Sequence, residues 1–330
     1  ESERTREELK YIAKNINNVD ELIVTDLNFG MYKQDMETAK EIAKIQKNFN
    51  YPVSVDAPAG KNMPKRIINI ASTMKGWSMG GVIQSSDPGV LKAIKRSNIS
   101  IHAYQDLIDF GNKQKANRTY TEIILGLPED TKEKHFKSLR LGVEKNVNNL
   151  RMHQAMLLVG TEMASKKDRE KYGLITKFRT LPGNVGNYNI LNKEHPVAEV
   201  EEIVVGSNTL SVDDYVECRI MNLIIKAFYN NNIFNEVHSM QRAMGISPFD
   251  CLLYIKEHEE IYTEKIKKII EGFVHETKED LFDSREQANE NVLLPNIINK
   301  YINGELGTNE LFLYSALLFS EFKDITDLIF

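Results

Sequence analysis

The sequence predicts an α/β protein: a partial (β/α)6 TIM-like barrel of parallel strands, followed by an α-helical C-terminal domain. Apolar strand-like segments and amphipathic helix-like segments alternate five times between residues 21 and 159, with connections long enough for parallel βαβ units. Several of these strands end in polar side chains, which is where parallel α/β proteins bind ligands. After residue 208 nearly every segment has helical periodicity.

The segment 80–96, GGVIQSSDPGVLKAIKR, shows the repeating unit most plainly. An apolar strand ends in Gln-Ser-Ser, and Asp87 and Pro88 then stand where an N-cap and a first helical residue belong. The segment 121–131, TEIILGLPEDT, repeats the design. The same alternation predicts strands over 21–26, 51–56, 79–84, 121–126 and 150–159, and helices over 36–49, 63–74, 88–96, 104–115 and 132–144.

The two ends of this alternation set the expected domain boundaries. Residues 1–16 already have helical spacing with no strand before them, so we expect the first barrel strand to be missing and the chain to be part of a longer protein. Residues 173–188 carry Gly, Pro and Asn without periodicity and are predicted to be a long loop. We therefore expect a barrel domain over 1–208 and a helical domain over 209–330.

The bulk composition is that of an ordinary soluble globular protein. The 330 residues are 42% hydrophobic and 27% charged, with a formal net charge of −5. The net negative charge argues against nucleic-acid binding, and no apolar run approaches the length of a membrane span. The two cysteines, Cys218 and Cys251, argue against a disulfide framework and favour a reducing, cytoplasmic location.

The predicted strand ends together carry a rim of hydrogen-bonding groups that suits a zwitterionic, nucleoside-like ligand. No Walker loop or GxGxxG fingerprint is present to bind phosphates, and no HExxH or close cysteine pair supplies a metal site. The rim residues are Asp26, Asn28, Asp56, Lys61, Gln84, Ser85, Ser86, Glu122, Glu129, Arg151, His153 and Gln154.

Four segments in order resemble motifs of radical S-adenosylmethionine enzymes. The segment 80–96 resembles their strand-four unit, 122–129 their strand-five motif, 157–163 the turn after strand six, and 26–30, DLNFG, the strand-two motif. The resemblance covers about residues 21–163. The segment YPVSVD with its GKN loop and the segment EEIVVGSNTLSVDDYVECR are most similar to members that carry an N-terminal cobalamin-binding domain.

The resemblance implies S-adenosylmethionine as cofactor, cleaved reductively at a 4Fe–4S cluster to a 5′-deoxyadenosyl radical, with cobalamin as a further cofactor. The family holds its cluster on a C-x3-C-x2-C loop, which this sequence lacks, so cluster cysteines are expected upstream of Glu1 and no metal ligands in this chain. The implied partners are a small-molecule substrate and an electron donor such as flavodoxin or ferredoxin. Methyl transfer and rearrangement both remain open.

The resemblance also implies roles for particular residues. Asp26, Asn28, Phe29 and Gly30 would hold the methionine amine, largely through backbone oxygens. Gln84 and Ser85 would reach the ribose or carboxylate, with Arg96 or Arg151 pairing with that carboxylate. Glu122 would lie among the cofactor contacts, and Leu125, Gly126 and Met152 would meet the adenine. Asp56, Lys61 and His153 are the candidate substrate contacts.

Two alternatives use the same residues differently. A barrel that lacks a cluster could bind a nucleoside-like ligand or a protein partner without turnover. An unrelated aldolase-type barrel would use Lys61 as a Schiff-base lysine. Structural roles compete as well, since Asp87 with Pro88 can serve only as a helix start and His153 can be a satisfied barrel histidine.

Overall fold

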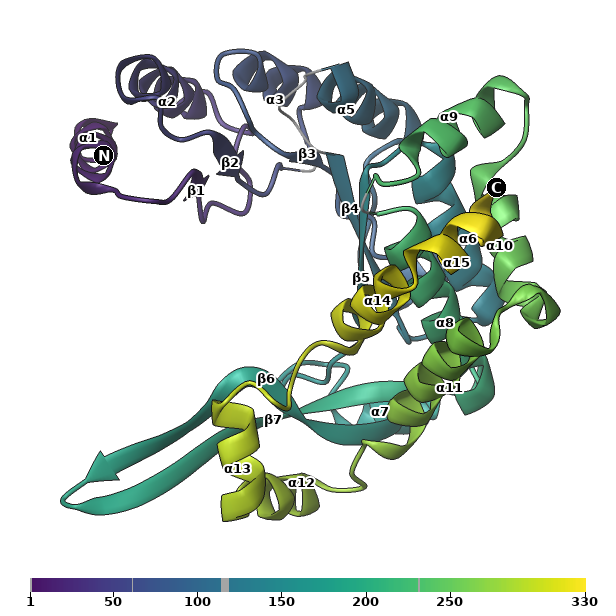
Figure 1. The fold of residues 1–330 in the computed structure, drawn as a ribbon. Helices are drawn as coiled ribbons and strands as arrows, with labels where there is room; N and C mark the ends of the chain where they lie inside the picture. The colour runs from purple at the N-terminus through teal and green to yellow at the C-terminus, as the bar shows by residue number, and fades with distance from the viewer. Residues whose placement is uncertain (1, 61, 114–118, 231) are drawn as a thin grey trace. The chain divides into compact units, whose positions relative to one another are not determined.

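The computed structural model describes residues 2–60, 62–113, 119–230 and 232–330 (Figure 1). Contacts divide the chain into two compact units. The bounds of these units differ from those of the two domains expected from the sequence, 1–208 and 209–330. Unit 1 contains Glu1–Gln84, Ser97–Ile123 and Leu141–Arg151, and unit 2 contains Ser85–Arg96, Ile124–Arg140 and Met152–Phe330. The proposed boundary near residue 208 falls in the connection between β7, which ends at Gly206, and α8, which begins at Val212.

The first half of the chain alternates strands and helices, which confirms the α/β prediction. The strands are β1 (Glu21–Ile23), β2 (Ser54–Asp56), β3 (Met79–Gly80), β4 (Thr119–Leu125) and β5 (Asn149–Gln154). The helices are α1 (Ser2–Asn15), α2 (Asp35–Phe49), α3 (Pro64–Ala71), α4 (Pro88–Ala93), α5 (Ile101–Lys113) and α6 (Lys132–Glu144).

The strands lie side by side in the order of the sequence. β1 pairs in parallel with β2, and a parallel bridge from Val55 to Trp77 connects β2 to the segment that leads into β3. β3 pairs in parallel with β4, and β5 follows β4 in the same sheet. Sequential parallel order is what successive βαβ units produce. Within the described residues the strands do not close into a barrel, because β1 pairs with no strand other than β2.

The core of unit 1 lies between this sheet and its helices. Trp77 is fully buried, and its indole N–H donates a 2.9 Å hydrogen bond to the carbonyl of Ala57. Phe29 packs edge to face against Trp77, with ring centres 5.1 Å apart. Ile42 of α2 and Ile67 of α3 belong to the same buried cluster. A buried indole whose N–H is hydrogen-bonded contributes a large apolar surface to this cluster without leaving a polar group unpaired.

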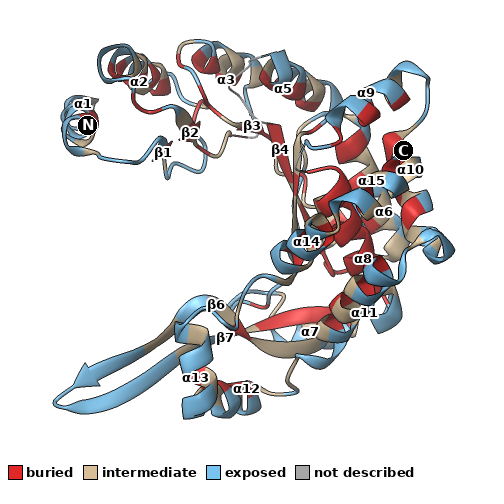
Figure 2. Ribbon diagram, viewed as in Figure 1, coloured by how far each residue is buried: buried red, intermediate tan, exposed pale blue. Residues whose placement is uncertain are grey.

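Unit 2 contains a long antiparallel hairpin where a loop was expected. β6 (Ile175–Ile190) pairs with β7 (Lys193–Gly206), and the register shifts between Thr180 and Val185. The loop prediction for 173–188 is therefore wrong. Residues 183–197 of the hairpin are mostly exposed (Figure 2), so no buried face imposed an apolar alternation there, whereas residues 202–206 at the end of β7 are buried.

Helices make up most of the rest of unit 2. α8 is almost entirely buried and packs against α10, α11 and α14. The remaining bounds are α7 (Lys166–Tyr172), α8 (Val212–Phe228), α9 (Asn235–Ala243), α10 (Pro248–Glu257), α11 (Glu264–Glu279), α12 (Arg285–Val292), α13 (Pro295–Ile302), α14 (Glu310–Ser320) and α15 (Phe322–Ile329), with a 3-10 turn at Glu259–Ile261. No helix in the described ranges is long and apolar enough to span a membrane.

Candidate functional site

Three charged side chains from the strands of unit 1 lie close together. The Arg151 guanidinium lies 3.6 Å from a Glu122 carboxylate oxygen and 3.9 Å from one of Asp56. Its carbon lies 4.0 Å from the ring centre of Tyr120, which supports it from one side. Asp56 ends β2, Tyr120 and Glu122 belong to β4, and Arg151 belongs to β5. All three charged residues were predicted site residues, and the ligand contacts expected of them stay predictions.

The electrostatics of this cluster leave room for a ligand. Both ion pairs are longer than a normal charged hydrogen bond, and each of the three side chains keeps about a third of its surface exposed. Burial raises the pKa of Tyr120 to about 12, so the phenol is neutral and presents its ring to Arg151. Two carboxylates around one guanidinium can bind both ends of a zwitterion, because each charge has a counterpart.

Gln84 adds a polar group to unit 1. Its backbone N–H donates a 2.8 Å hydrogen bond to the carbonyl of Glu122, which fixes its place beside β4. Its φ is +55°, an uncommon conformation for a residue with a side chain. The buried side-chain oxygen has no hydrogen-bond partner among the residues that the structure describes. An unpaired buried acceptor is costly unless a ligand or water supplies a donor.

The DLNFG segment is held mainly by its own turn. The Asp26 carboxylate accepts a 2.9 Å hydrogen bond from the Asn28 N–H, and both side chains are exposed. The carbonyls of Asn28 and Phe29, which were expected to bind an amine, accept from the N–H groups of Met31 and Gly60. Phe29 belongs to the core, and Gly30 has a φ of +88° and donates to the buried Asp35. The amine-binding role of this segment stays a prediction.

Several predicted site residues belong to unit 2. Ser85 is buried, and its hydroxyl accepts from the Asp87 N–H at 3.2 Å, while Arg96 is exposed just beyond α4. The Leu125 carbonyl accepts a 2.8 Å hydrogen bond from Ala155. Gly126 has a φ of +85°, and a Cβ added there would lie 3.2 Å from the Val204 carbonyl oxygen. Lys61 lies outside the described residues.

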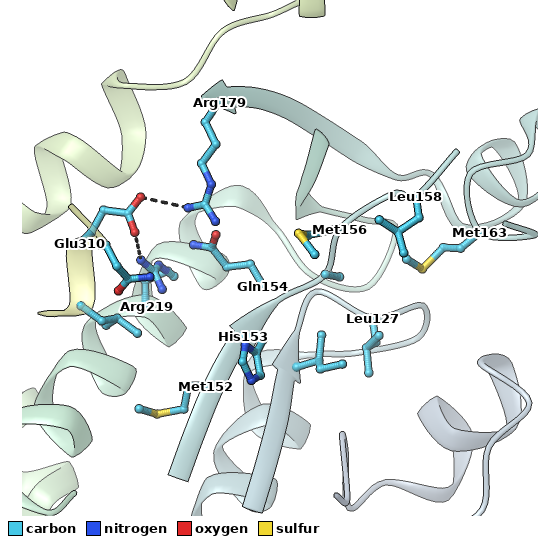
Figure 3. A pocket seen from close by; sticks show the side chains of 14 residues that line it. Leu127, Met152, His153, Gln154, Met156, Leu158, Met163, Arg179, Arg219 and Glu310 are labelled. Carbon is cyan, nitrogen blue, oxygen red and sulfur yellow. Dashed lines mark hydrogen bonds and ion pairs between the residues drawn. The ribbon is translucent and has the colours of Figure 1, made fainter. Parts of the chain in front are cut away.

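A pocket of about 340 Å³ in unit 2 collects further candidates (Figure 3). Met152, His153 and Gln154, at the end of β5, line it together with apolar side chains that include Ile124 and Leu127. His153 is exposed at this pocket, which leaves its predicted substrate contact untested. Three charged lining residues, Arg179, Arg219 and Glu310, were not predicted from the sequence. Of these three residues, only Arg219 stood out in the sequence, because it interrupts the apolar run of α8.

The residues of this chain do not fit an iron–sulfur cluster. Cys218 and Cys251 are single thiols, and burial raises the pKa of Cys218 above its usual range. No group of three histidine, cysteine, aspartate or glutamate side chains in the described part of the chain is arranged to hold a metal ion. The cluster cysteines expected from the family resemblance stay a prediction.

No family model matches the chain, but two characterised proteins are similar to it in sequence. The cobalamin-dependent radical S-adenosylmethionine methyltransferase TokK of Streptomyces tokunonensis is 30% identical over 231 residues, covering 66% of this chain and 31% of TokK. This chain is similar to the cobalamin-dependent radical S-adenosylmethionine enzymes. The family resemblance expected from the motifs is thereby confirmed.

The second relative is the 2-(S-pantetheinyl)-carbapenam-3-carboxylate methyltransferase of Streptantibioticus cattleyicolor. It is 29% identical over 232 residues, covering 66% of this chain and 32% of that protein. The chain thus spans about a third of the length of these relatives, which are enzymes. Among solved structures, the radical S-adenosylmethionine methyltransferase TsrM of Kitasatospora setae has a TM-score of 0.43 and 14% identity, covering 59% of this chain and 36% of TsrM.

Proposed function

We propose that this chain is part of a cobalamin-dependent radical S-adenosylmethionine methyltransferase and carries residues that bind S-adenosylmethionine. The sequence similarity to two such methyltransferases over about 230 residues is the observation that carries the proposal. The strands of unit 1 would then be part of a (β/α)6 barrel that lacks its first strand. The parallel pairing of β1 with β2 and of β3 with β4, with β5 next to β4 in its sheet, supports this interpretation.

Within this function, the Arg151 cluster would bind the amino-acid end of the cofactor. Arg151 is held by Tyr120 and by two loosely paired carboxylates, so an incoming carboxylate can displace one of these weak pairs. Glu122 and Asp56 would then face the positive charges of the ligand. Gln84 would accept a hydrogen bond from the ligand through its unpaired side-chain oxygen.

Bound S-adenosylmethionine supplies a methyl group or, after one-electron reduction at a 4Fe–4S cluster, a 5′-deoxyadenosyl radical. The cluster, the cobalamin and the electron donor such as flavodoxin or ferredoxin would contact the protein outside the residues described above. The chain's own contribution is to bind and orient the cofactor. A reducing, cytoplasmic location would suit this chemistry.

Turnover by the full-length protein tests the proposal. The protein is reconstituted with iron, sulfide and cobalamin, and is then given a one-electron reductant and S-adenosylmethionine carrying a deuterated methyl group. We expect S-adenosylhomocysteine and 5′-deoxyadenosine by mass spectrometry, with lower yields from Arg151→Gln and unchanged yields from the surface control Asp327→Asn. A reconstituted protein that binds S-adenosylmethionine but forms neither product would contradict the proposal and favour a binding module.

A further inference from the structure

A small polar chamber lies beside the apolar pocket of unit 2. It has a volume of about 110 Å³ and shares four lining residues with the 340 Å³ pocket. The shared residues are Gln154, Arg179, Arg219 and Glu310. Figure 3 shows the Gln154 amide directed toward Arg179 and the Arg219–Glu310 pair. The two spaces therefore meet at one polar boundary.

Four buried polar atoms that belong to lining residues of the chamber have no hydrogen-bond partner among the described residues. They are the Nε of Arg219, the hydroxyls of Tyr215 and Thr277, and the side-chain oxygen of Gln154. Tyr215 and Arg219 are 1% and 3% exposed, so bulk water does not reach them. Each unpaired buried group costs free energy, and four in one chamber indicate a place built for a hydrogen-bonding occupant.

The charges of the chamber are already compensated. Arg179 lies 3.0 Å from one carboxylate oxygen of Glu310, and Arg219 lies 3.4 Å from the other. Arg179 also pairs with Glu201. The lining adds Asp280 and Glu276, and burial raises the pKa of Glu276. An added anion would meet these carboxylates, so the chamber suits an uncharged group better.

The unpaired atoms specify the kind of uncharged group. Arg219 Nε can only donate, the two hydroxyls can donate, and the Gln154 oxygen can only accept. A carboxylate lacks a donor for Gln154, and an ammonium lacks an acceptor for Arg219. A carboxamide offers both in one small planar group. The adjoining pocket offers an apolar wall that includes Leu127, Met152, Met156 and Met163.

We propose that pocket and chamber form one site for a ligand with an apolar body and an amide-type head, the body lying against the methionine side chains and the head entering the chamber. This inference builds on the proposed methyltransferase function, since such a ligand would be the substrate or a part of it. Ligand sites commonly combine apolar walls with a few well-placed polar groups.

Three small probes, each with a short alkyl chain and a different polar head, test the site in the full chain. Butyramide, butyrate and butylammonium are titrated into the protein at neutral pH, and binding is followed by NMR. We expect butyramide to bind best, and Tyr215→Phe and Thr277→Val each to weaken it about tenfold through one lost hydrogen bond. The exposed Tyr188→Phe is the matched control and should bind butyramide like the unmodified chain.

The outcomes separate the site from ordered water. Equal or tighter binding of butyrate or butylammonium would overturn the proposal, as would no binding of any probe with ordered waters on the four atoms in a crystal structure. Tyr215→Phe should leave the melting temperature unchanged or raise it, because the hydroxyl has no partner to lose; a clear fall would show a structural water and count against the ligand. Because the probes need no turnover, a failure here is distinct from a failure of the methyltransferase proposal.

Discussion

The guanidinium of Arg151 stacks on the ring of Tyr120 at 4.0 Å while its two carboxylate neighbours stay beyond normal hydrogen-bond distance. The ring therefore sets the orientation of the guanidinium, and the carboxylates Asp56 and Glu122 set its charge balance. An arginine held by a buried ring keeps its hydrogen-bonding edge available for a ligand. This arrangement links the packing of β3 and β4 to the proposed cofactor site.

Gly80→Ala should disturb the stacking of Arg151 on the Tyr120 ring. A Cβ at position 80 would lie 2.5 Å from the Tyr120 ring, so the ring would have to move. We expect a loss of about 1–3 kcal/mol in the free energy of unfolding, the usual cost of overpacking. Urea denaturation measures it. In the double variant Gly80→Ala/Tyr120→Leu the clash should be absent, so its loss of unfolding free energy should be smaller than the sum of the two single losses. A double variant whose loss equals that sum would contradict this packing.

Asp87→Ala should weaken the start of α4. The Asp87 carboxylate accepts hydrogen bonds from the N–H groups of Gly89 and Val90, at 2.9 and 3.0 Å. Losing such a cap costs about 1 kcal/mol in the free energy of unfolding. Asp87→Asn keeps an acceptor and should cost less. Equal losses for the two variants in thermal denaturation would show that the charge, and not the cap, is what matters.

Asp130→Asn should change how stability depends on pH. Burial raises the pKa of Asp130 to about 7, despite hydrogen bonds from the Thr131 and Gly126 N–H groups. The folded state therefore holds this proton more tightly than the unfolded state, so stability is full below about pH 4 and falls as pH rises toward 7. The variant removes this loss, which amounts to at most about 4 kcal/mol.

Urea denaturation at pH 5 and pH 8 measures the Asp130 effect. The stability of Asp130→Asn relative to the unmodified chain should rise between these two pH values. Asp327→Asn removes an exposed carboxylate and serves as the control, with no such rise expected. A constant difference between Asp130→Asn and the unmodified chain at both pH values would refute the buried, proton-holding carboxyl.

Short sequence patterns correctly predicted features that depend on neighbouring residues in the chain. Asp87 followed by Pro88 predicted the N-cap and first turn of α4, and the structure confirms both. The polar residues assigned to the predicted strand ends included Asp56, Glu122 and Arg151, because the strand ends of parallel α/β proteins are where ligands bind. These three are in contact, although their ligand remains a proposal.

The missed features depend on contacts between distant segments. β6 pairs with β7, and the outer part of this hairpin is mostly exposed, so the Gly and Asn residues of β6 gave turn signals and no alternation. The chamber brings together Gln154, Tyr215, Thr277 and Glu310, which lie on β5, α8, α11 and α14. No spacing rule connects residues so far apart, and only the packing of α8 against α11 and α14 assembles them.

The most direct test of the central claim is whether Arg151 binds the carboxylate of S-adenosylmethionine. Calorimetry compares S-adenosylmethionine with its decarboxylated form, in the unmodified full-length protein and in Arg151→Gln, with Arg96→Gln as the competing candidate. We predict that Arg151→Gln weakens S-adenosylmethionine about tenfold and leaves the decarboxylated ligand unchanged. An equal effect on both ligands, or a selective effect of Arg96→Gln alone, would contradict the account.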